Sequence, residues 1–591
     1  MPRTTLALTS FVSGEFGNKL TGRTDFDKYQ SAAKTMENFL VHPQGAATRR
    51  VGTQFIAEVK DSSKKTRLIP FEFSTTQTYI LEFGNQYIRF YKDKGQIVTG
   101  SPAAAYEISS PYLEAELFDI KFAQSADVMY LCHPNHDVRK LSRTGHTSWT
   151  LTTVSFTGSP SLPISGSNNR PSCVSFYEQR LAFAGTNNNP QTIWFSKAGD
   201  YENFTTGTNA DDAMIYTIAS NQVNAIRYLK AQRTLIVGTS GGEFTVSADG
   251  TDASITPTNI NIKKQSSYGS ANVDAVAAGN AVLFLQKAKR KIRELAYNFD
   301  SDSYVAPDLT ILNDIVTESG IVQMEWQQEP DNILWCVRED GQLAALTYQR
   351  SEAVVSWHRH ILGGSFGSGN SVTESIASIS GVLNEDELWV IVKRTINGAT
   401  KRYIECFSDF DFDETEATDF KFLDSHLNYS GSATTTLSGL SHLEGQTVSI
   451  LADGSVHANK VVSSGSISLD RSVTKACVGL AYDSILQTMR IEGGAAEGTS
   501  QGKTKRISKV VLRLFETVGV KVGPSLSNLE VVPFRTTSSN LSAPVDTLIE
   551  GDKEIEFNDD YNSDGYIFIK QDQPLPASIL AIYPTLVTND G

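Results

Sequence analysis

Short runs of apolar residues separated by polar turns recur along most of the chain, whereas stretches with the 3.6-residue period of an amphipathic helix are scarce. The runs are rich in Val, Ile, Thr, Phe and Tyr, and the segments between them in Gly, Asn, Asp and Ser. Seven segments share one pattern, an apolar strand followed by a polar turn and a second strand. They begin near residues 79, 127, 181, 234, 281, 333 and 388. The pattern predicts a mainly β protein.

The seven segments follow one another at an average interval of about 52 residues, which is typical of the blades of a β-propeller. A blade is a small sheet that cannot bury both faces alone, so a ring of blades closes the core. Ordinary hairpins of a β-sandwich would instead repeat at about 8–12 residues per strand, without a longer rhythm. We therefore predict an irregular β-propeller over residues 76–408. It has six or seven blades, depending on whether the first hairpin belongs to the preceding segment.

Two regions lie outside this rhythm. Residues 1–75 form a separate N-terminal segment. From residue 409 the sequence changes to short strands with Gly, Ser and Thr turns, including a predicted hairpin turn at Asp453-Gly454. Residues 409–504 are predicted to form a small β domain, and residues 505–591 a C-terminal β segment.

Composition limits the class of protein. A chain of 591 residues is too long for one ordinary core and should form two to four domains. Lys and Arg number 52 and Asp and Glu 66, a net charge of −14, which argues against a general nucleic-acid coat or a membrane-surface binder. The five cysteines are scattered and form no C-x-x-C pair, so we expect buried free thiols and a protein made in a reducing cytoplasm. The sequence has no apolar run long enough for a membrane span and no signal-peptide core.

The charge is unevenly distributed along the chain. Residues 1–75 carry 11 basic and 7 acidic side chains, whereas residues 409–500 carry 5 basic and 13 acidic ones. The net surface charge can differ in this way from one domain to another without a functional reason. The alternative interpretation is that the two regions face different partners.

Motifs for catalysis or phosphate binding are weak. Gly238-Thr239-Ser240-Gly241-Gly242 matches the G-x-S-x-G pattern, but a strand rather than a helix follows, which favours a hairpin turn. Gly502-Lys503-Thr504 resembles the end of a P-loop, but Glu497 stands where the first glycine is required. No local segment supplies the paired carboxylates of a glycoside hydrolase, although a propeller can gather such a pair from different blades. We predict no catalytic residues.

Metal motifs are equally incomplete. Asp560, Asn562 and Asp564 match the opening of a calcium loop, but Gln571 occupies the position of its closing glutamate. The histidine pairs His133/His136 and His358/His360 have no carboxylate or cysteine at metal-ligand spacing, so they are interpreted as turn or surface residues. We predict no metal and no cofactor.

Several segments resemble a known family. The N-terminal half of the likeness includes Phe11 to Phe16, Gly22 to Asp25, and Asn38-Phe39-Leu40-Val41-His42-Pro43-Gln44-Gly45-Ala46-Ala47-Thr48-Arg49-Arg50. Later matches, in chain order, are Arg67 to Phe71, Leu81 to Gly84, Phe122 to Asp127, Gln222 to Ile226, Ser267 to Ser270 and Gln571 to Pro576. The sequence resembles the tail nozzle proteins of short-tailed bacteriophages, also called tail tubular or tail stabilisation proteins. It departs from their pattern at Val51, where a proline is expected, and at Gly17-Asn18.

The resemblance implies a structural virion protein and not an enzyme. Six copies would form a ring below the dodecameric head–tail adaptor, genome DNA would leave through its lumen, and tail fibres or spikes would dock outside. Residues 1–75 would form the adaptor-facing platform, which residues 505–591 complete unless they belong to the nozzle itself. Residues 409–504 would form the nozzle tip.

The charge pattern then suggests specific site residues. A basic tube would hold the phosphates of DNA, whereas an acidic rim would repel them and let the genome pass. We expect Arg49 and Arg50 to face the adaptor. The acidic rim of the channel is expected to contain Asp409, Asp411, Asp413, Glu414, Glu416, Asp419 and Asp424.

Two other classes of function remain open from the sequence. A propeller in a phage tail could bind or cleave a cell-surface glycan with carboxylates at its mouth. A propeller could also serve only as an interaction scaffold inside a cell.

Overall fold

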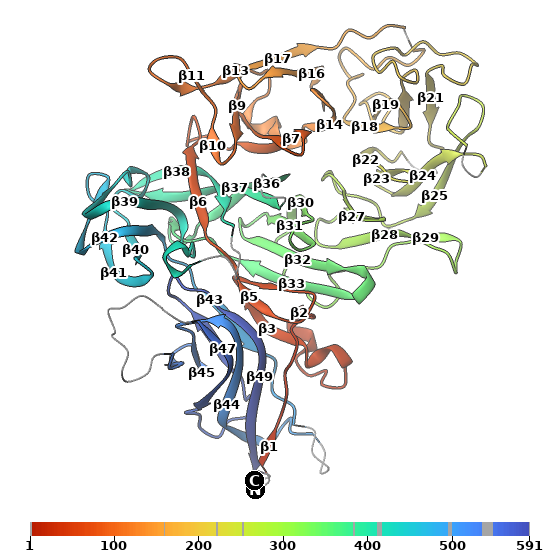
Figure 1. Cartoon of the computed structure of the whole chain (residues 1–591). Helices are drawn as coiled ribbons and strands as arrows, with labels where there is room; N and C mark the ends of the chain where they lie inside the picture. Colours follow the sequence, from red (N-terminus) through yellow and green to blue (C-terminus); the bar gives the residue numbers. More distant parts are fainter. Residues whose placement is uncertain are drawn as a thin grey trace.

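Figure 1 shows the computed structural model of the chain, which describes residues 3–158, 160–219, 223–250, 253–381, 385–409, 416–493, 499–534 and 548–589. A ring of small sheets occupies the upper part of the view. A sheet-rich stem, which we call the platform, lies below it and carries both chain termini at its far end. A smaller unit, containing β39 to β42, lies at the side of the ring.

The ring is a β-propeller with seven blades in the described part of the chain, each built on four strands in a row; blade 1 has a fifth strand, β13 (Glu107–Ser109), which pairs with β9. From the inner strand outward, the first three blades are β7 (Arg67–Ser74), β8 (Gln77–Gly84), β9 (Tyr87–Lys92) and β10 (Gly95–Gln96); β14 (Lys121–Ser125), β15 (Val128–His133), β16 (His136–Gly145) and β17 (Ser148–Thr153); and β18 (Cys173–Tyr177), β19 (Arg180–Ala184), β20 (Thr192–Phe195) and β21 (Met214–Thr217). The next two are β22 (Ile226–Ala231), β23 (Leu235–Thr239), β24 (Gly242–Ala248) and β25 (Ile260–Ser266); and β26 (Val276–Ala278), β27 (Ala281–Leu285), β28 (Ile292–Asn298) and β29 (Ser303–Val305). The last two are β30 (Ile321–Gln327), β31 (Ile333–Arg338), β32 (Leu343–Gln349) and β33 (Val354–His360); and β36 (Val372–Ser380), β37 (Asp386–Ile396), β38 (Ala399–Phe407) and β6 (Thr53–Glu58).

The seven predicted hairpins are the two middle strands of the seven blades, so the predicted propeller is confirmed and its blade number is seven. The period arises because each blade needs one central hairpin, whose first strand is largely buried on both faces and is therefore strongly apolar. Phe183 of β19 and Leu283 of β27, for example, are fully buried. The first hairpin, β8 and β9, belongs to the propeller and not to the preceding segment.

The ring closes through a strand from the N-terminal region. β6 pairs with β38 as the outer strand of blade 7, and the chain then enters the inner strand of blade 1. Leu68 and Ile80 of blade 1 pack with Trp389 and Ile404 of blade 7 in one buried cluster. The propeller therefore begins at Thr53, and the predicted boundary between residues 75 and 76 is wrong because β6 and β7 are propeller strands.

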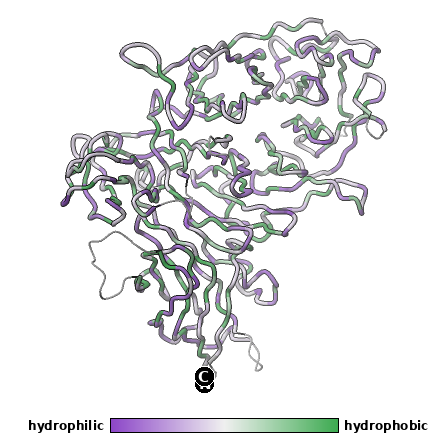
Figure 2. The backbone as a smooth tube through the Cα atoms, in the orientation of Figure 1, coloured by the Kyte–Doolittle hydropathy of each residue, from purple (hydrophilic) through white to green (hydrophobic). Residues whose placement is uncertain are grey.

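The platform is built from both ends of the chain. One of its sheets contains β1 (Arg3–Thr5), β4 (Phe39–Val41), β5 (Ala47–Arg49), β44 (Thr504–Thr517), β47 (Ile549–Glu556) and β49 (Ser578–Asn589). The other contains β2 (Gly14–Glu15), β3 (Ala32–Glu37), β43 (Ser484–Thr488), β45 (Lys521–Ser525), β46 (Asn528–Val531) and β48 (Phe568–Gln571). A common core joins N-terminal side chains such as Met36 to C-terminal ones such as Leu512 and Ile569. Figure 2 shows hydrophobic stretches distributed over all parts of the chain, in agreement with several cores.

The side unit consists of β39 (Asp424–Ser438), β40 (Thr447–Ala452), β41 (Ser455–Val461) and β42 (Ser466–Leu480). Its hairpin turn at Asp453-Gly454 is confirmed, with positive φ at both residues. The unit is shorter than the predicted 409–504, since β43 already pairs with β3 of the platform.

Sheet pairing joins the three parts. β33 of blade 6 pairs in parallel with β2 and β3 of the platform, and β6 of blade 7 pairs in parallel with β39 of the side unit. Gly14 permits the first junction, because a Cβ atom there would lie 2.5 Å from the Trp357 backbone nitrogen.

Two predictions from composition can be compared with the structure. All five cysteines are buried and free of disulfides, as predicted. In the described part of the chain, no helix combines the length and apolar character needed to span a membrane.

Candidate functional sites: a buried joint and the propeller axis

The three parts of the molecule meet at a buried network of charged side chains, which we call the joint. Arg50 follows β5 of the platform, Thr53 begins β6, and Asp424 begins β39 of the side unit. Arg394 and Glu405 come from β37 and β38 of blade 7. All five side chains are buried.

Arg50 and Asp424 form a bidentate ion pair at the centre of the joint. Arg50 Nη1 lies 2.8 Å from Asp424 Oδ1, and Nη2 lies 2.7 Å from Oδ2. The remaining guanidinium N–H groups donate to Asn38 Oδ1 and to the carbonyl oxygens of Val51 and Ile361. All five donors of the guanidinium group are thus used, which is what a fully buried arginine requires.

A second buried pair lies beside the first. Arg394 binds Glu405 through both Nη atoms and donates from Nε to the Gly363 carbonyl at 2.6 Å. Thr53 connects the two pairs, since its hydroxyl donates to Glu405 Oε2 at 2.6 Å and its backbone N–H donates to Asp424 Oδ1 at 3.1 Å. The Gly363 N–H also donates to Asp424, at 2.6 Å. The network therefore ties platform, propeller and side unit together through directional bonds.

The electrostatics of the joint favour its charged form. Burial alone would raise the pKa of Asp424, but the Arg50 guanidinium and the Gly363 N–H outweigh it and leave the pKa below its ordinary value. Burial would likewise lower the pKa of Arg50, and the Asp424 carboxylate reverses this effect. Both groups remain ionised near neutral pH, so the arrangement is a mechanical connection without a group poised for proton transfer.

The prediction that Arg49 and Arg50 face an adaptor is wrong for the side chains themselves. Arg49 is also buried, where it donates to the carbonyl oxygens of Leu575 and Tyr482 and stacks on the Tyr482 ring. Both guanidinium groups therefore bind acceptors inside the protein, namely backbone carbonyl or carboxylate oxygens from distant segments of the chain.

The predicted acidic rim has a mixed outcome. Asp424 is buried in the joint and cannot belong to a channel rim, since its carboxylate is fully used by Arg50 and backbone donors. Glu416 and Asp419 are exposed, and Asp419 pairs with Lys475 of β42 at 2.8 Å. Asp409 is half-buried and pairs with Lys94 of blade 1. Asp411, Asp413 and Glu414 lie outside the described residues.

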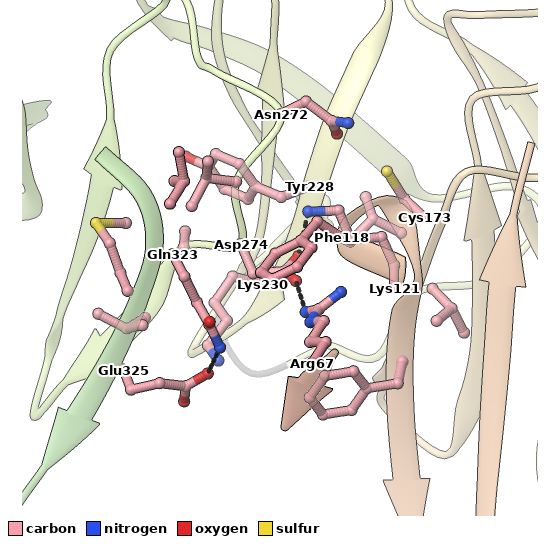
Figure 3. Close-up of a pocket in the computed structure, with 18 of the residues that line it drawn as sticks. Arg67, Phe118, Lys121, Cys173, Tyr228, Lys230, Asn272, Asp274, Gln323 and Glu325 are labelled. Atoms are coloured by element: carbon pink, nitrogen blue, oxygen red, sulfur yellow. Dashed lines mark hydrogen bonds and ion pairs between the residues drawn. The ribbon is translucent and has the colours of Figure 1, made fainter. Parts of the chain in front are cut away.

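A second site lies on the propeller axis. Inner strands of blades 1 to 6 line a cavity of about 240 Å³, and Figure 3 shows the polar side chains that converge on it. The labelled lining residues include Arg67, Lys121, Lys230, Asp274, Gln323 and Glu325. Its volume is below the roughly 300–1,000 Å³ of common ligand sites. A DNA duplex, whose major groove alone is about 12 Å wide, cannot enter it.

The cavity contains two carboxyl groups in different environments. Asp274 pairs with Lys121 at 2.9 Å and lies 3.9 Å from Arg67 Nη2. Glu325 accepts a hydrogen bond from Gln323 Nε2 at 3.2 Å, and burial raises the pKa of Glu325 to about 7. Asp274 is thus held in an ion pair, whereas the pKa of Glu325 is raised toward neutral, and a carboxyl group with a raised pKa can serve acid–base chemistry on a small ligand.

Other motifs from the sequence have structural roles. Ser240 and Gly241 form the turn between β23 and β24, as predicted. Asn562 accepts the N–H groups of Asp564 and Gly565 and thereby closes the turn that resembled a calcium loop. His358 and His360 are not turn or surface residues, since both are buried in β33 and hydrogen-bonded to each other. His133 is also buried, at the end of β15.

Comparison with known proteins identifies no family for the chain. No family model matches the chain, and a search of curated proteins finds no match. Among solved structures it is similar to the β-propeller domain of Cps50 (Swd1) from Myceliophteria thermophila, with 9% identity and a TM-score of 0.36, covering 60% of this chain and 99% of that one. For the WD40 domain of Neurospora crassa Pan2 the sequence identity is 8% and the TM-score 0.36, and the match covers 62% of this chain and 96% of that one. For the WD40 repeats of RRP9 the sequence identity is 8% and the TM-score 0.39, and the match covers 61% of this chain and 100% of that one. At such identities the likeness concerns the fold alone.

Proposed function

We propose that the chain is a structural subunit of the tail nozzle of a short-tailed bacteriophage, made in the host cytoplasm and assembled into the virion. Six copies form a ring below the dodecameric head–tail adaptor, tail fibres or spikes dock on its outside, and genome DNA leaves through its lumen. The ring is a heterologous assembly that closes by rotation. Its task is mechanical and involves neither catalysis nor a cofactor.

The joint is the observation that carries this proposal. Two of the sequence segments on which the resemblance rests, residues 38–50 and 571–576, lie far apart in the chain yet meet beside the joint. Asn38 accepts a hydrogen bond from Arg50, and Arg49 donates to the carbonyl oxygens of Gln573 and Leu575. A resemblance carried by residues that lock the platform to the propeller supports a subunit whose parts must stay rigid under load.

The path of DNA follows from the size of the axial cavity. A duplex cannot pass through a cavity of about 240 Å³, so a conduit requires a space between several copies. The net charge of −14 disfavours adhesion of phosphates to such a wall. The exposed carboxylates of Glu416 and Asp419, together with Asp409, are the described candidates for the channel rim.

Assembly on adaptor-bearing particles tests the proposal. Purified chain is added to phage heads that carry the adaptor but lack the nozzle, and the particles are imaged by electron microscopy. We expect a sixfold ring below the adaptor and retention of packaged DNA. Particles that remain bare, with the chain monomeric in solution, would overturn the proposal. A ring whose lumen lies away from residues 416–480 would overturn the assignment of the rim.

The axial cavity favours a second candidate function, the binding or cleavage of a cell-surface glycan. The observation behind it is a pair of carboxyl groups in different environments, Asp274 in an ion pair with Lys121 and Glu325 with a pKa raised by burial. Incubation with host polysaccharide, followed by measurement of new reducing ends, separates the two functions. Activity that disappears in both Glu325→Gln and Asp274→Asn would establish the glycan function, and its absence in the wild type would exclude cleavage.

A further inference from the structure

A cluster of two histidines and a carboxylate lies between blades 1 and 2. Glu116 is on the short 3-10 helix η3 (Glu114–Asp119), which connects the blades. His133 ends β15 and His136 begins β16, so the two residues are direct partners across the hairpin turn. One ligand atom from each of the three side chains lies within 4.8 Å of the other two.

Hydrogen bonds already orient most of this cluster. His136 Nε2 lies 2.8 Å from Glu116 Oε2, and Asn135 Nδ2 donates to Glu116 Oε1 at 3.2 Å. The Leu113 N–H donates to Glu116 Oε2 at 2.9 Å and fixes the carboxylate against the start of η3. Metal sites commonly use such supporting bonds to hold their ligands in place.

His133 differs from its neighbours because one ring nitrogen is left without a partner. The side chain is buried at 2% exposure, and its Nδ1 accepts the Asn135 N–H at 3.1 Å. Its Nε2 has no hydrogen-bond partner among the described residues. A buried polar atom without a partner is costly, and coordination of an ion by this nitrogen would remove that cost.

We propose that Glu116, His133 and His136 bind a divalent transition-metal ion of the zinc class, with solvent in the remaining position. Two imidazoles and one carboxylate suit such ions and do not suit Mg²⁺ or Ca²⁺, which prefer oxygen ligands. Solvent can reach the site, because the side chains of His136 and Glu116 are 20% and 16% exposed. The ion would replace the hydrogen bond between His136 Nε2 and Glu116 Oε2.

The consequence of binding is a link between two blades. Glu116 belongs to the connector that leaves blade 1, whereas both histidines belong to the central hairpin of blade 2. A metal ion that binds only the folded arrangement stabilises it increasingly as the ion concentration rises above the dissociation constant. The site goes beyond the nozzle function and does not depend on it.

The test uses the full chain with Zn²⁺ alone. We expect one ion per chain in calorimetric titration and a rise in the thermal unfolding temperature, with no such effect of Ca²⁺. Glu116→Gln and His136→Gln should each weaken binding at least tenfold and abolish the rise. Both positions are partly exposed, and glutamine at 116 can still accept the Leu113 N–H, so these variants retain the fold.

His42→Gln is the matched control, because His42 Nδ1 pairs with Asp331 Oδ2 at 2.8 Å away from the cluster. It should leave Zn²⁺ binding unchanged. The proposal is overturned if the wild type binds no Zn²⁺, if binding survives in Glu116→Gln and His136→Gln, or if His42→Gln weakens it equally.

Discussion

Arg50 and Asp424, which lie 374 positions apart in the sequence, form a bidentate ion pair with no solvent exposure of either side chain. The pair joins the segment after the platform strand β5 to the first residue of the side unit, and it contacts blade 7 through Thr53. Removing two charges from water is expensive, and only a complete set of partners compensates for it. The joint therefore stabilises the fold only if every one of its members is present.

Replacing Arg50 by alanine should lower the free energy of unfolding by about 3–5 kcal/mol, because Asp424 would remain as a buried charge without its counter-ion. Asp424→Asn should lower it by a similar amount, because Arg50 would then be the buried charge without a counter-ion. The double variant Arg50→Met/Asp424→Leu should be less destabilised than the sum of the single changes. Urea denaturation measures all three, with hydrogen exchange in residues 424–438 as a local readout.

The exposed pair Arg513–Asp552 provides the control for this prediction. It has the same bidentate form, at 2.8 and 2.9 Å, but both side chains are nearly half exposed. Arg513→Ala should cost less than about 1 kcal/mol. Equal losses from Arg50→Ala and Arg513→Ala would contradict the assigned role of burial.

Gly52 permits the backbone of the joint to close. A Cβ atom at this position would lie 1.8 Å from the Leu423 carbonyl oxygen, so Gly52→Ala forces two backbone segments apart. We expect a loss of at least about 3 kcal/mol of stability, or failure to fold. Gly22→Ala is the control, since its Cβ would meet nothing within 4 Å, and it should change stability by less than about 0.5 kcal/mol. A mild effect of Gly52→Ala in a thermal unfolding assay would show that the contact can relax.

The propeller is predictable because the information for a blade is local. Strands such as β27 and β28 are neighbours in sequence, are largely buried and are joined by one polar turn. Ring closure is not local, because β6 pairs with β38 across more than three hundred residues. The pattern of Thr53 to Glu58 indicates a strand but does not specify its partner.

The joint is not predictable, for a different reason. Arginine is normally a surface residue, so the sequence of Arg49 and Arg50 favours a partner surface. The burial of Arg50 depends on acceptors such as Asn38, Ile361 and Asp424, which only the folded chain brings together. The proximity of Glu116 to the histidine pair is hidden likewise, since the acid comes from the preceding blade connector.

Buried histidines should make the protein sensitive to acid. Burial lowers the pKa of His358 and His426 to about 3 and that of His442 to about 4. Unfolded histidine titrates near pH 6.5, so between pH 6.5 and 4 the unfolded chain binds more protons than the folded chain. The stability of the fold therefore decreases as the pH is lowered through this window. At pH 5 each group should cost about 2 kcal/mol relative to neutral pH.

His442→Gln tests this window, since glutamine can replace the donation from His442 Nε2 to the Ser425 carbonyl oxygen. Unfolding free energies between pH 5 and 7.5 should depend less steeply on pH in this variant than in the wild type. The exposed His146 provides the comparison, and His146→Gln should retain the wild-type slope. An unchanged slope in His442→Gln would refute the contribution of this histidine.

Glu325 should have the opposite pH dependence. Burial raises its pKa to about 7, so the folded chain binds more protons than the unfolded chain between pH 4.5 and 7. Its contribution to stability is complete below pH 4.5 and is lost as the pH rises through 7. Glu325→Gln removes this loss, so the variant should exceed the wild type by about 2–3 kcal/mol at pH 8.5 and match it near pH 4.5. Glu554→Gln, at an exposed carboxylate paired with Lys509, should show no such divergence. If Glu325→Gln changed the free energy of unfolding equally at both pH values, the change would come from packing at the propeller axis and not from ionisation of Glu325.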